Sequence, residues 1–468
     1  MVIRFGTSGW RAIVADEFTF ANVSRVTKAV CRYLQASSAA LDAALIVGYD
    51  TRFLAENFAE HCASEVAAAG YRAIFCDHAT PTTTIAHTIR DRSAAGGISF
   101  TASHNPPEYN GMKLLTADGV PALSEAMRQI EQFISEIPED GGQTVVSAGA
   151  TNVEKYDPRP AYLADLARKV RFDVLARPGG SYAYDPLWGT GRGYLDRALR
   201  DNGLEVETLH DWSDALFGGR APEPDEQCLE ELRAAMKRRG CVLGLATSGN
   251  CEHFGVLDAD GTFIAPNRLI PLLFDYLAES RGWTGDVARS VATSHLVDRV
   301  AAARGLPVLE TPAGFNFIGE LIGQDKSVPG GAEAAGLATR AHYPEQDGIL
   351  ACLLAAEAVA ARGASLREQL EELYRRVGRT ETAHIGVRLT PDVQARLTEK
   401  LKQDPAEIGG RRVARTNHTD GVKLVFDDGS WLLLRPSGTE PLVRIYAESE
   451  SAQDLEVLLE QGRKYLLD

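Results

Sequence analysis

Residues 101–113 read Thr-Ala-Ser-His-Asn-Pro-Pro-Glu-Tyr-Asn-Gly-Met-Lys and directly follow the short apolar run Gly97-Ile98-Ser99-Phe100. The apolar run predicts a buried strand. Asn105-Pro106-Pro107 then ends regular structure, because proline fixes φ and lacks an N–H group. Ser103 is therefore expected on a stiff turn at a strand end, where α/β proteins often carry reactive groups. We call residues 101–113 the serine loop; an ordinary polar loop is the alternative interpretation.

Strand, loop and helix follow one another three times along the chain. This pattern predicts an α/β fold with mixed, mainly parallel sheets and helices on both faces. The expected strands are 45–49, 182–184 and 287–292. Each is followed by an expected helix: 58–69 after the first strand, a helix carrying Leu195 and Leu199 after the second, and 296–303 after the third.

The last part of the chain has a different pattern. After Arg379 apolar and polar residues alternate, and Asp427-Asp428-Gly429-Ser430 predicts a hairpin turn before a strand over 431–434. A final helix is expected over 452–467. These features predict a smaller C-terminal α+β domain with an antiparallel sheet.

The length of 468 residues predicts three or four domains. We place boundaries near residues 155, 258 and 375, and linkers in 139–154 and 362–382. The resulting domains are 1–155, 156–258, 259–375 and 376–468.

Composition narrows the function classes. Hydrophobic residues make up 44% of the chain, which is enough for several cores, and the net charge is −15. This charge argues against nucleic acid and acidic membranes as partners, although cations gathered in a cleft would still allow an anionic ligand. The seven cysteines include no CxxC pair, and no signal peptide or long apolar stretch is recognised. We expect a cytoplasmic protein with reduced thiols, either a monomer or a homodimer.

The serine loop closely resembles the phosphoserine loop of the α-D-phosphohexomutases, the phosphoglucomutase/phosphomannomutase family. Gly6-Thr7-Ser8-Gly9-Trp10-Arg11 is similar to the N-terminal signature of that family. The resemblance implies four domains around a central cleft and a transferable phosphoryl group on Ser103. It also implies that Arg11, His104 and Lys113 assist proton transfer and neutralise charge beside that serine.

A second loop with a family counterpart is Arg435-Pro436-Ser437-Gly438-Thr439-Glu440-Pro441, followed by Arg444. Backbone N–H groups of a Ser-Gly-Thr turn, the hydroxyls of Ser437 and Thr439 and a guanidinium suit a phosphate group. The stretch resembles the phosphate-binding loop of the family, and this implies phosphate contacts from Arg435, Ser437, Gly438, Thr439 and Arg444. A solvated turn is the alternative.

The metal loop of the family is altered. Family members carry Asp-Gly-Asp-Ala-Asp-Arg there, whereas this chain has Ser248-Gly249-Asn250-Cys251-Glu252-His253. Three carboxylates that hold Mg²⁺ thus become Ser248, Asn250 and Glu252. We therefore expect weak Mg²⁺ binding, or binding only when Ser103 is phosphorylated. A Zn²⁺ site from Cys251, Glu252 and His253 is disfavoured, because adjacent residues point in different directions and no fourth ligand is evident.

The sugar loop is altered as well. Family members carry a pattern similar to Gly-Glu-x-Ser-Gly there, and its glutamate and serine bond sugar hydroxyls. This chain has Gly331-Ala332-Glu333-Ala334-Ala335, with alanine at both of these contact positions. A hydrogen bond to a charged group contributes about 1.5–3 kcal/mol, so an ordinary hexose phosphate should bind more weakly. The remaining candidates for substrate contact are Glu333, Asn316 (where relatives typically have lysine) and His342.

Two hypotheses follow. The first is a divergent phosphohexomutase that transfers a phosphoryl group through Ser103, with a sugar bisphosphate as the expected intermediate or activator. The second is a pseudoenzyme that binds a phosphosugar without transferring the phosphoryl group. The intact serine loop favours the enzyme, and the lost carboxylates favour the pseudoenzyme.

Overall fold

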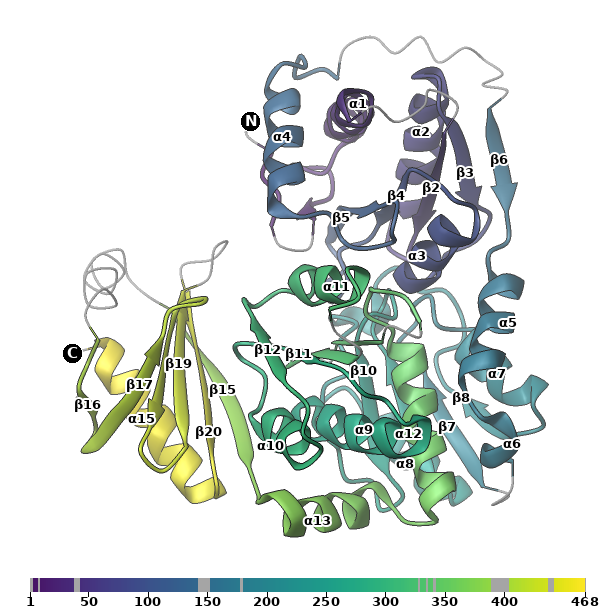
Figure 1. The fold of residues 1–468 in the computed structure, drawn as a ribbon. Helices are drawn as coiled ribbons and strands as arrows, with labels where there is room; N and C mark the ends of the chain where they lie inside the picture. Colours follow the sequence, from purple (N-terminus) through teal and green to yellow (C-terminus); the bar gives the residue numbers. More distant parts are fainter. Residues whose placement is uncertain are drawn as a thin grey trace.

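Four β-sheets follow one another along the chain, each with its own helices (Figure 1). The computed structural model describes residues 3–6, 9–37, 43–141, 152–176, 180–326, 329–333, 336–339, 342–388, 404–436 and 442–467. The sheets divide the described chain into successive layered units.

The first sheet has six strands in the order β1-β5-β4-β2-β3-β6, and it is mixed, because β1, β5 and β4 pair antiparallel while β4, β2, β3 and β6 pair parallel. Alternate residues of β2 face opposite sides: Leu45 and Val47 pack in the core with α1, α2 and α4, and Ile46 packs with α3. The elements are β1 (Trp10–Ile13), α1 (Phe20–Ala36), β2 (Ala44–Tyr49), α2 (Ala55–Ala68), β3 (Arg72–Cys76), α3 (Thr82–Asp91), β4 (Gly96–Phe100), β5 (Tyr109–Thr116), α4 (Ser124–Ser135) and β6 (Val153–Tyr156).

The second and third sheets have four strands each, in the orders β10-β9-β7-β8 and β12-β11-β13-β14. In each sheet one edge pair is antiparallel and the other pairs are parallel. The second unit contains α5 (Arg159–Lys169), α6 (Phe172–Leu175), β7 (Ser181–Asp185), α7 (Leu195–Asp201), β8 (Glu205–Thr208), the short 3₁₀ helix η1 (Phe217–Gly219), α8 (Glu230–Arg239), β9 (Leu243–Thr247) and β10 (Phe254–Asp258).

One apolar core runs through the second and third units, so the two sheets share buried side chains from α5, α9 and α12. The third unit contains α9 (Pro266–Arg281), β11 (Val287–Ser290), α10 (Leu296–Ala303), β12 (Val308–Thr311), α11 (Phe315–Gly323), β13 (Pro329–Ala332), β14 (Gly336–Thr339), α12 (Gly348–Arg362) and α13 (Leu366–Val377).

The fourth sheet is antiparallel throughout, in the order β15-β20-β19-β18-β17-β16, and α15 packs on one face of it. Figure 1 shows this unit beside β11 and β12 of the third. Its elements are β15 (Glu381–Arg388), β16 (Glu407–Ile408), β17 (Arg411–Asn417), β18 (Val422–Phe426), β19 (Trp431–Pro436), β20 (Leu442–Ser449) and α15 (Ala452–Leu467). The predicted fold class is confirmed: three α/β units with mixed, mainly parallel sheets precede a smaller antiparallel one.

The linker predictions need correction. Segment 362–382 holds α13, a helix capped by reciprocal hydrogen bonds between Ser365 and Glu368, and it buries Leu366, Leu370 and Leu373. Its many charged residues lie on the outer face, so composition alone conceals this apolar side. The other predicted linker, 139–154, extends into β6, which adds a parallel strand to the first sheet; residues 142–151 lie outside the described part.

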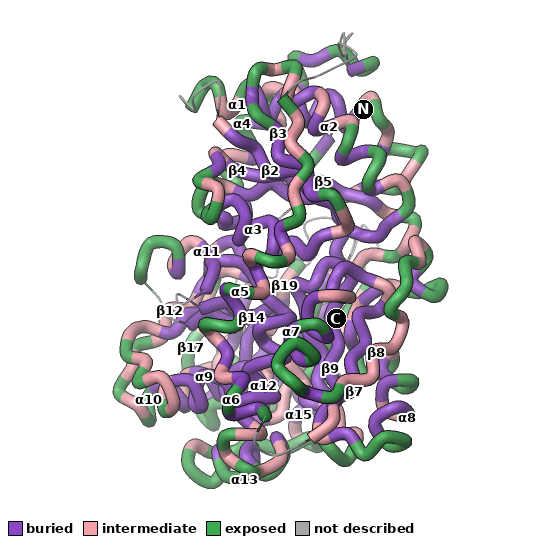
Figure 2. Tube along the Cα trace, turned by 90° about the vertical axis from the view of Figure 1, so that its right-hand side faces the viewer, coloured by how far each residue is buried: buried purple, intermediate pink, exposed green. Residues whose placement is uncertain are grey.

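The central strands of the sheets are mostly buried, as the tube in Figure 2 shows. Among the described residues no single helix is long and apolar enough to cross a membrane. The pair α12 and α13 passes that test only together, and the two are bent by 79° relative to each other. Helix α12 is itself a core helix, because nearly its whole length is buried.

Candidate active site

Ser103 lies where strand β4 has ended, on a turn that only tertiary contacts can hold. Its φ is +52°, a left-handed conformation that is uncommon for residues with a side chain. The residue is 2% exposed, and its backbone N–H donates to the Thr101 hydroxyl at 2.8 Å. Thr101 in turn donates to the Asp50 carboxylate at 2.6 Å. The turn is therefore fixed from the neighbouring strand β2, which ends one residue before Asp50.

Arg52, which is not among the site residues predicted from the sequence, holds the serine loop in place. Its guanidinium is buried against Asp50, with 3.2 Å between Nε and Oδ2. The remaining guanidinium N–H groups donate to four loop carbonyls, those of Ser103 (2.7 Å), Asn105 (2.6 Å), Pro106 (2.8 Å) and Tyr109 (3.0 Å). A planar, five-donor group suits such a set of acceptors. The position of Asp50-Thr51-Arg52 after a strand that pairs with β4 was the available signal.

The hydroxyl of Ser103 meets the second unit. Its Oγ lies 3.3 Å from Oδ1 of Asn250 and 3.4 Å from Oε2 of Glu252, both in the loop between β9 and β10. It also lies 3.5 Å from Nδ1 of His104. The structure therefore brings together the predicted serine and two residues of the altered metal loop, although 147 or more positions separate them in the chain.

Lys113 joins two buried carboxylates beside this hydroxyl. The ammonium, carried by β5, forms ion pairs with Glu252 and with Glu345, and 2.8 Å separate Nζ from Glu345 Oε2. Burial alone would lower the pKa of Lys113, but the two carboxylates raise it above its ordinary value. Burial raises the pKa of Glu345 to about 7, with Glu252 acting in the same direction and Lys113 against it. Glu345 is a second site residue that was not predicted from the sequence.

The residues Ser248, Asn250 and Glu252 do not form a good Mg²⁺ site in this arrangement. The carboxylate of Glu252 is already paired with the ammonium of Lys113. Ser248 and Asn250 are neutral, and their side chains are 3.3 Å apart and hydrogen-bonded to each other. Mg²⁺ prefers several charged oxygen ligands in octahedral geometry. A phosphoryl group on Ser103 would have to supply the missing negative charge.

The side chains of Cys251, Glu252 and His253 diverge in a bent loop, in which Cys251 has a φ of +64°. Cys251 Sγ lies 3.3 Å from the Thr190 hydroxyl, and Glu252 pairs with Lys113. His253 instead points to Glu223, with 2.9 Å from Nδ1 to each carboxylate oxygen. These three residues thus do not share one ligand position.

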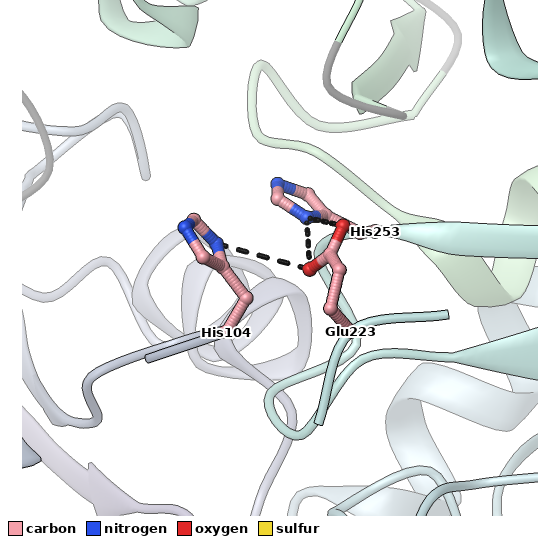
Figure 3. A group of neighbouring side chains, drawn as sticks. All are labelled: His104, Glu223 and His253. Carbon is pink, nitrogen blue, oxygen red and sulfur yellow. Dashed lines mark hydrogen bonds and ion pairs between the residues drawn. The ribbon is translucent and has the colours of Figure 1, made fainter. Parts of the chain in front are cut away.

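The Glu223 carboxylate faces two neighbouring histidines, as Figure 3 shows. His104 Nδ1 is 3.9 Å from Glu223 Oε2, and the rings of His104 and His253 are stacked with 5.2 Å between centroids. Burial lowers the pKa of His104 to about 3, and the neighbouring His253 acts in the same direction. For His253, the pKa is raised despite burial, because the Glu223 carboxylate is adjacent. At neutral pH His104 is therefore an uncharged imidazole beside Ser103.

Arg11 approaches the serine loop from β1, where it lies opposite Gly111 of β5. One guanidinium nitrogen donates to the Asn105 side chain at 2.8 Å. Burial lowers the pKa of Arg11, with the charge of Arg52 acting in the same direction and that of Glu252 against it. Arginine nevertheless stays protonated in proteins, so Arg11 brings fixed positive charge to the loop.

The predicted phosphate loop is described only at its two ends. Arg435 and Arg444 lie directly opposite each other on β19 and β20, an arrangement in which like charges repel unless an anion is shared. Arg435 Nε donates to Asp420 at 2.8 Å. The charge of Arg444 contributes to the lowered pKa of His104, which puts the fourth unit within electrostatic range of the serine loop. Ser437, Gly438 and Thr439 lie outside the described residues.

The three residues predicted to contact the substrate have different surroundings in the structure. Glu333 accepts a hydrogen bond from the Ser290 hydroxyl and affects the pKa of His384 and Tyr446 in the fourth unit. Asn316 is 3% exposed, and its Oδ1 has no hydrogen-bond partner among the described residues. Glu333 therefore remains a candidate because it lies near the fourth unit. Asn316 remains one because its side-chain oxygen has no hydrogen-bond partner among the described residues.

His342 is fully enclosed, and this placement argues against the substrate contact predicted for it. Its Nδ1 lies 2.9 Å from Nζ of Lys169, and its Nε2 pairs with Asp347. Asp347 caps α12 and also accepts hydrogen bonds from Tyr162 at 2.7 Å and Thr83 at 3.0 Å. These residues come from three units, so the network around His342 holds the units together.

Comparisons with known proteins match the succession of the four units. Four family models for phosphoglucomutase/phosphomannomutase match in order: alpha/beta/alpha domain I over residues 2–140, domain II over 160–261, domain III over 265–377 and the C-terminal domain over 393–464.

Individual relatives span the whole chain. A "Phosphoglucomutase/phosphomannomutase" from Thermococcus kodakarensis is 28% identical over 99% of this chain and 98% of its own. A "Probable phosphoglucosamine mutase" from Methanothermobacter thermautotrophicus is 28% identical over 99% and 97%. The crystal structure of a "putative phosphomannomutase" from Thermus thermophilus is 32% identical, covers 100% of both chains and has a TM-score of 0.87.

Proposed function

Because the chain belongs to the phosphoglucomutase/phosphomannomutase family, we propose that it transfers a phosphoryl group within a phosphorylated sugar through Ser103. The observation that carries this proposal is the setting of the hydroxyl. Ser103 is held in a strained conformation by Arg52 and faces groups that can exchange protons or balance charge. Strain of this kind persists where the surrounding structure enforces it, often at sites of chemistry.

The groups around Ser103 can be given separate roles. In one direction a sugar hydroxyl attacks the phosphorus of phosphoserine, the bond from phosphorus to Ser103 Oγ breaks, and Oγ takes the electron pair and a proton. In the reverse direction Ser103 Oγ attacks the phosphorus of a phosphosugar and gives up its proton, the bond from phosphorus to the sugar oxygen breaks, and that oxygen takes the electron pair and a proton. His104 is uncharged at neutral pH and lies 3.5 Å from Oγ, so it is the proposed proton acceptor.

Positive charge stabilises the transferring group in this proposal. The phosphoryl oxygens carry most of the negative charge in the transition state, so positioned cations contribute much of the rate. Lys113, Arg11 and Arg52 bring positive charge to the serine loop. Arg435 and Arg444 would hold the second phosphate of a sugar bisphosphate, because their opposed placement suits a shared anion.

The substrate is a phosphorylated sugar or sugar-like molecule that differs from a common hexose phosphate. Ala332 offers no hydrogen-bonding side chain at a predicted contact position, and it is buried at the end of β13. Glu333 and Asn316 supply other acceptors nearby. A sugar bisphosphate would serve as the activator that phosphorylates Ser103.

Mass spectrometry of the intact protein tests the proposal. Incubation with a panel of hexose and aminohexose 1,6-bisphosphates should add one phosphoryl group, and Ser103→Ala should remain unmodified. Ser64→Ala, which changes a partly exposed serine on α2, is the matched control and should be modified like the wild type. Phosphorylation of the Ser103→Ala variant would contradict the enzyme proposal. So would a wild-type protein that stays unmodified with every bisphosphate of the panel.

The pseudoenzyme is the second candidate, and one observation favours it. Glu252, the single carboxylate of the altered metal loop, is already neutralised by Lys113. In that case the protein binds phosphosugars with the two opposed arginines but never acquires a phosphoryl group. Calorimetry that detects phosphosugar binding together with unmodified mass would support this alternative.

A further inference from the structure

His104, Glu223 and His253 present three metal-binding side chains within one small space (Figure 3). One candidate ligand atom from each residue lies within 4.8 Å of those of the others. His104 comes from the serine loop, whereas Glu223 and His253 come from the second unit. We propose that these three residues bind a divalent transition-metal ion, Zn²⁺ being the best suited, beside Ser103.

The distances among the three side chains are close to those around one metal ion. His104 Nδ1 and Glu223 Oε2 are 3.9 Å apart, which is too long for a hydrogen bond. Two ligand atoms about 2.1 Å from one tetrahedral Zn²⁺ ion lie about 3.4 Å apart, so an approach of about half an ångström would let both atoms bind one ion. His253 Nδ1 lies 2.9 Å from each oxygen of Glu223, so a small rotation of this half-buried carboxylate would admit the ion.

The donor set selects the kind of metal. Two imidazole nitrogens and one carboxylate form the three-ligand set that Zn²⁺ uses when a fourth position stays open. Imidazole suits Zn²⁺ and its transition-metal neighbours, whereas Mg²⁺ prefers oxygen ligands. The His104 side chain is 44% exposed and that of Glu223 is 30% exposed, so one side of the group remains open for a fourth ligand.

The group lies beside the reacting hydroxyl, because Ser103 Oγ is 3.5 Å from His104 Nδ1, one of the three ligand atoms. With the ion bound, this nitrogen cannot also accept the serine proton, and the Glu252 carboxylate, 3.4 Å from Oγ, takes that role instead. An oxygen of a phosphoryl group on Ser103 can therefore occupy the fourth position. This last step rests on the proposed function, whereas metal binding by the three side chains does not. The ion would supply positive charge beside Ser103, where the altered metal loop provides only one carboxylate, Glu252, and that carboxylate is paired with Lys113.

Titration of the chelator-treated, full-length protein with Co²⁺ and with Zn²⁺ tests the site. Cobalt should bind one ion per chain and give the visible absorption of a four-coordinate complex, and Zn²⁺ should displace it while excess Mg²⁺ should not. Loss of a group that merely orients a ligand costs about 10–100-fold in affinity. Loss of a ligand in His104→Ala, Glu223→Gln or His253→Ala should therefore weaken binding by at least about 100-fold.

Matched variants show whether the metal occupies this group of side chains. His78→Ala removes the histidine of the group Asp77, His78 and Asp157, and it should leave the cobalt signal unchanged. Ser103→Ala should also bind cobalt like the wild type, so failure of phosphoryl transfer does not affect this test. His104 is the most exposed of the three ligands and its variant is the least prone to misfold; circular dichroism checks all variants. Unchanged cobalt binding in His104→Ala and Glu223→Gln, or loss of the signal in His78→Ala, would overturn the proposal.

Discussion

The carboxylate of Glu252 connects the ammonium of Lys113 to the hydroxyl of Ser103. One of its oxygens pairs with Lys113, and the other lies 3.4 Å from Ser103 Oγ. Glu345 contacts the same ammonium from the third unit at 2.8 Å. Two carboxylates thus share one buried cation. The protonation of these three groups affects the free energy of unfolding and also sets the net charge beside Ser103.

Removal of that cation should be costly. Lys113→Ala leaves two buried carboxylates without a partner, and breaking a buried ion pair in this way typically lowers the free energy of unfolding by about 3–5 kcal/mol. The double variant Lys113→Ala/Glu345→Gln should recover part of the loss, because one unpaired charge is removed. Urea denaturation measures both, and Arg92→Ala, which breaks a partly exposed pair with Glu154, is the control expected to cost about 1 kcal/mol or less. Equal losses in the Lys113 and Arg92 variants would be evidence against a buried charge cluster.

Glu345 should make stability depend on pH. Its pKa is raised from 4.5 to about 7 in the folded protein. Between these values the unfolded chain releases the proton while the folded protein keeps it, so the contribution of this group to stability falls as pH rises and levels off above about pH 7. Urea midpoints of wild type and Glu345→Gln, measured from about pH 4.5 to 8, should differ by an amount that changes through this window. A constant difference would show that the pKa of Glu345 is not raised.

Arg52 should matter for catalysis through position rather than contact. Arg52→Lys keeps the charge but cannot donate to four carbonyls, so the serine loop loses its fixed geometry. A misplacement of about 1 Å at a reacting group can cost about 100-fold in rate. We therefore expect the rate of Ser103 phosphorylation by a sugar bisphosphate to fall by about that factor in Arg52→Lys. Arg11→Lys keeps a donor for its single bond to Asn105 and should lose less; the reverse order would contradict the role of Arg52.

The parts of the structure that could be predicted from the sequence are those set by local sequence patterns. Helices 296–303 and 452–467 have the bounds expected from the sequence, because their apolar spacing is regular. The serine loop is recognisable because proline and glycine constrain it. Arg52, Glu223 and Glu345 were missed, because their roles arise from contacts between segments that are distant in the chain. Glu223 lies in an irregular stretch where no periodicity indicates which way a side chain points.

A further prediction tests whether the altered metal loop fails to bind Mg²⁺ because it lacks carboxylates or because its backbone has changed. Mg²⁺ should show no calorimetric signal with the unphosphorylated protein, because Glu252 is paired with Lys113 and the other two positions are neutral. The triple variant Ser248→Asp, Asn250→Asp, Glu252→Asp should bind Mg²⁺ if the backbone of the loop is intact. Tight binding of one Mg²⁺ per chain by the unphosphorylated wild type would refute this prediction.

The substrate prediction distinguishes an ordinary mutase from the divergent one proposed. Conversion of glucose 1-phosphate to glucose 6-phosphate should be negligible even with glucose 1,6-bisphosphate, because Ala332 cannot bond a sugar hydroxyl and an unpaired hydroxyl in a closed site is penalised. Binding of a phosphosugar should survive Ser103→Ala and be lost in Arg435→Ala, since the opposed arginines hold the phosphate. A coupled assay and calorimetry measure these outcomes. Turnover of glucose 1-phosphate at about 1 per second or faster, a typical enzyme rate, would show that the altered sugar loop still accepts a common hexose phosphate.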